Sequence, residues 1–120
     1  MNANSSRIIS FGNPIPPQHT TPAPERLLSG EPEQTIWNHY ADTSEQFFAG
    51  VWSSTRGKWR VQYTENEFCH LVAGAVVVTS DQGERWEFWA GDSFVVPAGF
   101  AGTWEVIEDC RKLYAIFEPR

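Results

Sequence analysis

The sequence predicts an all-β protein, a sandwich or barrel of short strands that follows an extended N-terminal arm. From Gln46 onward, short runs of β-branched and aromatic residues alternate with turn-forming residues, and no helical period interrupts them. The 6 tryptophans, 8 phenylalanines and 3 tyrosines suit strands, which favour aromatic side chains. A length of 120 residues fits one domain with a single core.

Five prolines interrupt residues 1–24, which therefore predict a flexible or swapped arm with at most a short strand at 7–11. Residues 25–120 are expected to form the domain, with its core in 45–118. Gly30 and Pro32 prevent a helix longer than one turn, and Thr35 to Tyr40 predicts the first strand of the domain.

The remaining strands are separated by short groups of turn residues. The clearest hairpin joins residues 75–80 to 84–89 around Asp81, Gln82 and Gly83. Turns are also expected at 73–74 and at 108–109. The predicted strands are 47–53, 57–63, 68–72, 75–80, 84–89, 94–96, 102–107 and 112–118.

Alternation along two of these strands assigns their faces. Trp59, Val61 and Tyr63 share one face of the 57–63 run, opposite a polar face, and therefore point inward. Trp104 and Val106 point inward by the same argument. The interior is then either an aromatic pocket or a filled aromatic core.

Charge and composition bear on partners and compartment. A net charge of −6 argues against a nucleic acid or an anionic membrane surface as partner. No stretch approaches the roughly 18 apolar residues of a membrane span, and Met1 to Phe11 lacks a secretory apolar region. The two cysteines form no CxxC motif and are expected to be thiols, so we expect a cytoplasmic protein.

The most chemically capable stretch is 57–74, in which a turn brings Tyr63 and Glu67 close together. A carboxyl group among aromatic side chains suits a general acid or base, although it can also be a structural hydrogen-bond partner. Tyr63 is either a donor to a ligand or a core tyrosine. His70, three residues after Glu67, faces outward unless a bulge at Asn66 reverses the alternation.

Three further positions, Cys69, Arg111 and Lys112, have ordinary structural interpretations. Cys69 shares the face of Glu67, where it either lines the pocket or is simply buried. Arg111 and Lys112 are expected on an outer edge of the barrel.

Several spaced positions resemble the two cupin motifs. Gly91, Pro97 and Gly99 match the second motif, and Glu67 with Gly74 matches the end of the first. Over residues 45–118 the chain resembles small single-domain cupins of the ureidoglycine aminohydrolase and ethanolamine-utilisation type (Cupin_3 or DUF861). The resemblance implies a cupin (RmlC-like) antiparallel jelly-roll β-barrel, a small-molecule pocket and a homodimer.

The resemblance fails at the metal ligands of that family. The two histidine positions before the glutamate are Val61 and Tyr63, the third is Gly102, and the asparagine position is Val106. Since borderline divalent metals need converging imidazole, thiolate and carboxylate groups, we expect no metal or other cofactor. The alternative is an atypical site of Tyr63, Glu67 and His70. Gly102 either leaves room for a ligand or lets Trp104 fill that room.

The sequence thus predicts a small-molecule-binding cupin with metal-independent acid/base chemistry, either hydrolytic or proton-transfer. The resemblance implies a small nitrogenous or carboxylated metabolite as its substrate. Glu67 would be the acid or base and Tyr63 a hydrogen-bond donor. Two alternatives stay open: a non-catalytic binding or sensing module, and a metal-dependent enzyme with atypical ligands. The residues expected to line the pocket are Trp59, Val61, Cys69, Gly102, Trp104 and Val106.

Overall fold

The computed structural model describes residues 6–120, which contain nine strands and no helix. Every pairing between these strands is antiparallel, as the all-β prediction requires. The strands are β1 (Gln18–Thr20), β2 (Leu27–Gly30), β3 (Gln34–Ala41), β4 (Phe47–Ser54), β5 (Gly57–Gln62), β6 (Asn66–Ser80), β7 (Arg85–Trp89), β8 (Ser93–Val96) and β9 (Ala101–Phe117).

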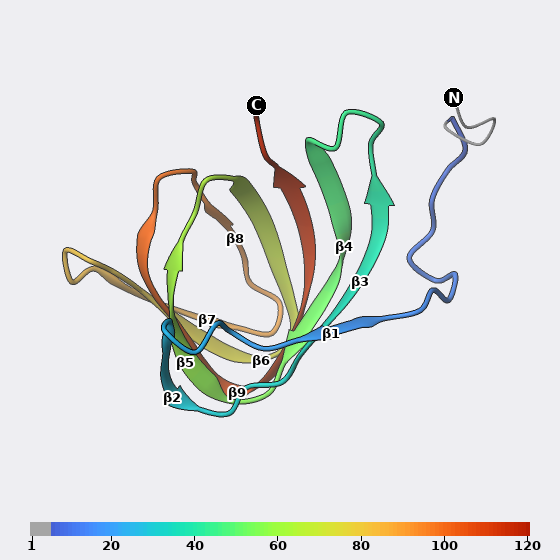
Figure 1. The fold of residues 1–120 in the computed structure, drawn as a ribbon. Helices are drawn as coiled ribbons and strands as arrows, with labels where there is room; N and C mark the ends of the chain where they lie inside the picture. Colours follow the sequence, from blue (N-terminus) through green and yellow to red (C-terminus); the bar gives the residue numbers. More distant parts are fainter. Residues whose placement is uncertain (1–5) are drawn as a thin grey trace.

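Two long strands, β6 and β9, organise the molecule. The first half of β6 pairs with the second half of β9 and with β8, while its second half pairs with the first half of β9 and with β7. Strand β9 continues outward to β4 through its second half and to β5 through its first. The result is a curled sheet that forms a half-barrel (Figure 1). This architecture confirms the predicted antiparallel jelly roll.

The turns predicted at 73–74 and 108–109 are wrong. Strands β6 and β9 run through both places, and β6 changes register between Leu71 and Ala75 as a β-bulge does. Gly74 has φ +84°, and a Cβ there would overlap the carbonyl oxygen of Asp109. Glycine therefore bends a strand at this position rather than ending one.

The core lies inside the half-barrel and confirms the predicted inward faces. Trp59 and Trp104 are buried there, and Trp52 packs on both of them with ring centroids 6.2 Å apart. The buried cluster consists of Trp59, Cys69, Leu71, Val76, Val78, Val96, Trp104, Val106 and Cys110.

The proline-rich start is more regular at one point than predicted. Strand β1 pairs with β3, although prolines flank it in the sequence. The strand considered at 7–11 does not form, and Phe11 stacks instead on His39 with ring centroids 4.7 Å apart. Within residues 6–120, no helix has the length and apolar character that a membrane crossing needs.

Gly102 serves packing, which corrects the expectation that it opens a space or leaves one for Trp104. It lies where β9 is paired with β5 on one side and β6 on the other, opposite Val61 and Ser80. A Cβ at this position would overlap the carbonyl oxygen of Thr79. Because Gly102 has no side chain, the backbones of β9 and β6 can approach each other closely at this position.

We expect Gly102→Ala to destabilise the protein by about 1–3 kcal/mol, because the added methyl group meets backbone that cannot move aside. Urea unfolding followed by circular dichroism measures the change. Gly12→Ala is the matched control, since its nearest neighbour is the Ser10 Oγ at 3.4 Å. Equal stability of the two variants would contradict this interpretation of Gly102.

The two cysteines are buried thiols in the core. Burial raises the pKa of Cys69 from 9.0 to about 12, even though the nearby Lys112 ammonium opposes the shift. Burial likewise raises the pKa of Cys110 to about 11. Both thiols are therefore protonated, and thus unreactive, in the folded protein at neutral pH.

These shifts predict a loss of stability in alkali. A thiol whose pKa is higher in the folded state stabilises the fold fully below pH 9.0, and loses that effect as the pH rises toward 11–12. The melting temperature should therefore fall from about pH 9 upward. At pH 8, a thiol reagent should label the cysteines only as fast as the protein unfolds. Rapid labelling of folded protein would contradict the prediction.

Candidate carboxylate cavity

A cavity of about 250 Å³ opens between β3, β4 and the second half of β9 on one side and β5 on the other. Three tryptophans form much of its wall, and six polar or charged side chains line the rest with Ile36, Val61 and Ile116. Small-molecule sites typically combine apolar walls with polar groups that orient the ligand. The lining residues are Gln34, Ile36, Trp52, Trp59, Val61, Tyr63, Glu65, Glu67, Trp104, Lys112, Tyr114 and Ile116.

Tyr63 and Glu67 meet in this cavity, as the sequence suggested. The Tyr63 hydroxyl donates a hydrogen bond of 3.0 Å to Oε1 of Glu67. Tyr63 follows the end of β5, and its backbone is held by the next loop: its N–H donates to Phe100 and its carbonyl accepts from Gly99. The phenol therefore reaches Glu67 from a fixed position.

Lys112 was expected on an outer edge, and this expectation is wrong. Lys112 is buried, and its Nζ lies 2.9 Å from Oε2 of Glu67. The ammonium group also lies over the rings of Trp52 and Trp104, 4.7 and 4.5 Å from their centroids. Cation–π contacts of this kind stabilise a buried charge. The parity of β9 was the missed signal, since Lys112 shares its face with Tyr114 and Ile116.

The charges in this group follow from its surroundings. Burial is the largest single effect and lowers the pKa of Lys112, but the charge and hydrogen bond of Glu67, together with Cys69 and Cys110, outweigh it and raise the pKa above its ordinary value. Burial, with the charge of Glu67, also raises the pKa of Tyr63 well above 10.0. At neutral pH the cavity therefore presents an ammonium group and a neutral phenol on either side of Glu67. We call Tyr63, Glu67 and Lys112 the carboxylate cluster.

The other predicted pocket residues divide into two groups. Trp59, Val61 and Trp104 line the cavity. Cys69 does not line it, but its Sγ lies 3.6 Å from Lys112 Nζ. Val106 is buried in the core, and Gly102 packs between strands, so neither of them lines the cavity.

Sequence reasoning missed the contribution of β3 and β4. Gln34 and Ile36 come from β3 and Trp52 from β4. Gln34 is only 9% exposed, and its side chain lines the cavity. The predicted strand at 35–40 was the available signal, but only the pairing of β3 with β4 shows that it closes the cavity.

His70 keeps the outward direction that alternation predicted. Glu67 and Cys69 are buried on one face of β6, while His70 lies on the other, with Nδ1 2.7 Å from the Ser93 Oγ. The fold therefore does not bring His70 to Glu67. Among residues 6–120, no group of three or more His, Cys, Asp or Glu side chains is arranged to hold a metal ion.

The residues at the cavity do not fit the metal that the cupin pattern implies. Val61 and Tyr63 supply no imidazole, and Gly102 supplies no side chain at all. The oxygens of Glu67 already contact a phenol and an ammonium group, and that ammonium would repel a divalent cation. The groups around Glu67 are therefore not suited to chemistry that depends on a divalent metal.

Comparisons with solved structures agree with the fold. The chain is similar to a DUF861 protein of unknown function from Pseudomonas syringae pv. tomato, at 26% identity and TM-score 0.79, over 90% of this chain and 46% of that one. It thus spans about half the length of that protein. A DUF861 protein from Thermotoga maritima is 30% identical over 55% of this chain and 75% of that one, at TM-score 0.54.

A putative ethanolamine utilization protein Q from Salmonella typhimurium shares the fold at TM-score 0.66 and 14% identity, over 90% of this chain and 100% of that one. A comparison with curated proteins found no match. The model of the EutQ-like cupin domain, Cupin_3, matches residues 41–114, which is more than half of the chain. The chain therefore belongs to the EutQ-like cupin family.

Proposed function

We propose that this cupin binds a small organic molecule in the tryptophan-lined cavity and transfers a proton to or from it with the carboxylate cluster. The observation that carries the proposal is the buried ion pair of Glu67 and Lys112 in the cavity wall. Perturbed ionisable groups that line a cavity are typical of functional sites.

Stability alone does not account for this ion pair. Removing two charges from water costs several kcal/mol per ion, and well-packed apolar residues in their place often leave a protein as stable or more so. Both side chains are only about 6% exposed, so little solvent compensates that cost. A role in binding or catalysis accounts for a buried ion pair of Glu67 and Lys112 at this position.

The chemistry follows from the three groups. The carboxylate of Glu67 accepts a proton from an acidic N–H, O–H or C–H of the bound molecule, and becomes a neutral acid. The ligand then carries the negative charge, and the Lys112 ammonium, 2.9 Å from Glu67, offsets it. Tyr63 stays protonated because its pKa is raised, so it donates a hydrogen bond throughout.

The cavity and the family suggest the kind of ligand. A volume of about 250 Å³ suits a small metabolite, and the tryptophan walls exclude water around it. Lys112 can meet a carboxylate or carbonyl oxygen, and Glu67 can meet an amine or amide N–H. These pairings support a small nitrogenous or carboxylated metabolite, in line with the resemblance to ureidoglycine aminohydrolase-type cupins.

One observation favours a second candidate, a binding module without catalysis. Both oxygens of Glu67 already have partners within the protein, at 3.0 and 2.9 Å. A carboxylate held in this way can orient a ligand without accepting a proton from it. The two candidates differ in whether the bound molecule is converted.

The first test screens small amino, amide and carboxylic acids for a rise in melting temperature, and follows each hit by NMR for conversion. We expect at least one hit to be converted, and Glu67→Gln to abolish turnover, because an amide cannot accept the proton. Glu105→Gln is the matched control, since Glu105 lies in β9 outside the cavity lining.

Circular dichroism checks that both variants are folded. Full activity of Glu67→Gln on a converted ligand would overturn the catalytic role. A ligand that binds but is never converted would favour the binding module.

A second test measures the ion pair itself. Lys112→Met leaves Glu67 buried without its cation, and should cost about 3–5 kcal/mol of stability in urea unfolding. The double variant Glu67→Leu with Lys112→Met should recover much of that loss, because no charge remains buried. If the changes in unfolding free energy of the two single substitutions simply add in the double variant, Glu67 and Lys112 are not coupled.

A further inference from the structure

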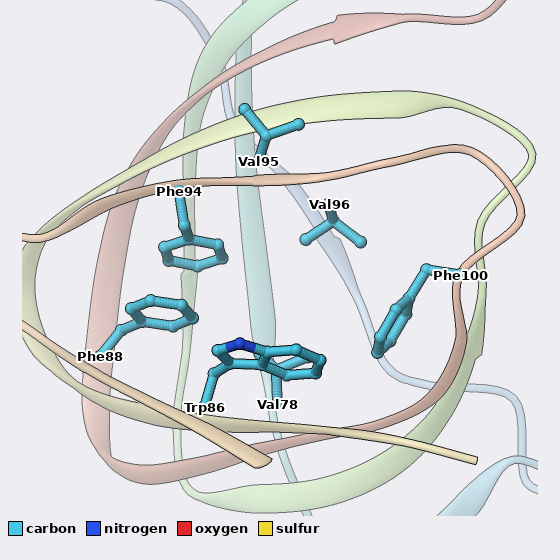
Figure 2. Close-up of a pocket in the computed structure, with 7 residues that line it drawn as sticks. All are labelled: Val78, Trp86, Phe88, Phe94, Val95, Val96 and Phe100. Atoms are coloured by element: carbon cyan, nitrogen blue, oxygen red, sulfur yellow. The ribbon is translucent and has the colours of Figure 1, made fainter. Parts of the chain in front are cut away.

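A second hollow lies at the other open side of the half-barrel. Strands β7 and β8 each pair with β6 and not with each other, so the sheet has two edges there. Between them lies a cleft of about 240 Å³ whose lining side chains are all aliphatic or aromatic (Figure 2). Its lining residues are Val78, Trp86, Phe88, Phe94, Val95, Val96 and Phe100. We call it the aromatic cleft.

The aromatic cleft is separate from the cavity that holds Glu67, and the two share no lining residue. Aromatic contacts form the partition between them. Phe94 packs against Trp104 with ring centroids 5.9 Å apart, and Phe100 meets Tyr63 edge-on at 6.3 Å. The aromatic cleft is therefore not part of the cavity that the carboxylate cluster lines.

Trp86 shows that the aromatic cleft is not filled by the chain. It is paired with Val78, and it points with Phe88 toward the inner side of the sheet. Yet Trp86 is 40% exposed, although an inward tryptophan in a filled core would be largely covered. The ring lies at the base of the open space in Figure 2, with Phe100 beside it.

The walls define what can occupy this space. Phe88 and Phe94 stack in parallel with centroids 3.8 Å apart, which makes one wall a pair of stacked rings. Trp86 and Phe100 are steeply inclined to each other at 64°, so they form a corner of two rings. Aromatic ligands gain affinity from ring contacts of this kind, beyond the gain from buried area.

The lack of charged side chains and the volume of the aromatic cleft further limit which ligands can bind there. No charged side chain lines the cleft, so a charged group there would lose its hydration without gaining a partner. A dry apolar cavity of about 150 Å³ holds benzene, and this cleft is larger at about 240 Å³. We propose that the aromatic cleft is a second binding site, for a small uncharged aromatic molecule of one or two rings.

Indole is a suitable probe, and the valine methyl groups are the reporters. In a ¹H–¹³C NMR titration, indole should shift the methyl resonances of Val78 and Val96 saturably, because an aromatic ring placed beside them adds a ring current. The methyl groups of Val61, in the other cavity, should not move. Cyclohexanol, which has no aromatic ring, should bind about tenfold more weakly.

Two tryptophans of β7 form a matched pair of variants. Trp86→Ala removes the base of the aromatic cleft and should weaken indole binding about tenfold or more. Trp89→Ala, in the same strand but outside the cleft lining, should leave the affinity within about twofold. Phe100→Leu gives an independent test if Trp86→Ala does not fold, and should also weaken binding.

Three outcomes would overturn the proposal. The first is the absence of a saturable shift at Val78 and Val96 up to the solubility limit of indole. The second is that both tryptophan variants bind indole as tightly as the unmodified chain does. The third is a dimer in sedimentation that excludes indole and that Trp86→Ala dissociates, which would show that a second copy of the chain covers the cleft.

Discussion

The interaction on which the site depends is the ion pair between Glu67 in β6 and Lys112 in β9. Lys112 is paired with Leu71, four residues along β6 from Glu67, and successive inward residues of a strand lie about 7 Å apart. The lysine side chain therefore runs along the strand past Cys69 to reach the carboxylate. The methylene groups of Lys112 can follow this path because its surroundings are apolar, and the rings of Trp52 and Trp104 cover its ammonium group.

This arrangement changes the meaning of the cupin pattern in this chain. At the positions where the pattern has histidines, the structure holds Val61, Tyr63 and Gly102. Positive charge beside Glu67 comes instead from Lys112, which approaches from another strand. The cavity thus keeps a carboxylate next to a cation, and a ligand that develops negative charge there would find that cation in place.

Features that depend on neighbouring residues of one strand can be predicted from the sequence, whereas features that depend on the pairing of distant strands cannot. Strand alternation placed Trp59, Tyr63 and Trp104 correctly, because facing depends on neighbours in the same strand. For Lys112 the two signals disagree: strand parity predicts an inward position, whereas residue type predicts an outer one because lysines are seldom buried. Four predicted strands merge into β6 and β9. In β6 the merging is hidden because glycine marks both turns and bulges, and in β9 because the polar residues Glu108 and Asp109 resemble a turn. Gln34 depends on pairing between distant strands, which no local pattern specifies.

The loop at Gly99 and Phe100 forms part of the partition between the two hollows. Phe100 belongs to the wall of the aromatic cleft, and its carbonyl accepts the Tyr63 N–H at 2.8 Å. The Gly99 N–H donates to the Tyr63 carbonyl at 2.7 Å, so the backbone of the loop is tied to Tyr63 twice. A ring that enters the cleft can therefore displace the Phe100 side chain only by rotating it. Since that side chain packs on the Tyr63 ring, the phenol that donates to Glu67 lines one hollow and contacts a residue that lines the other.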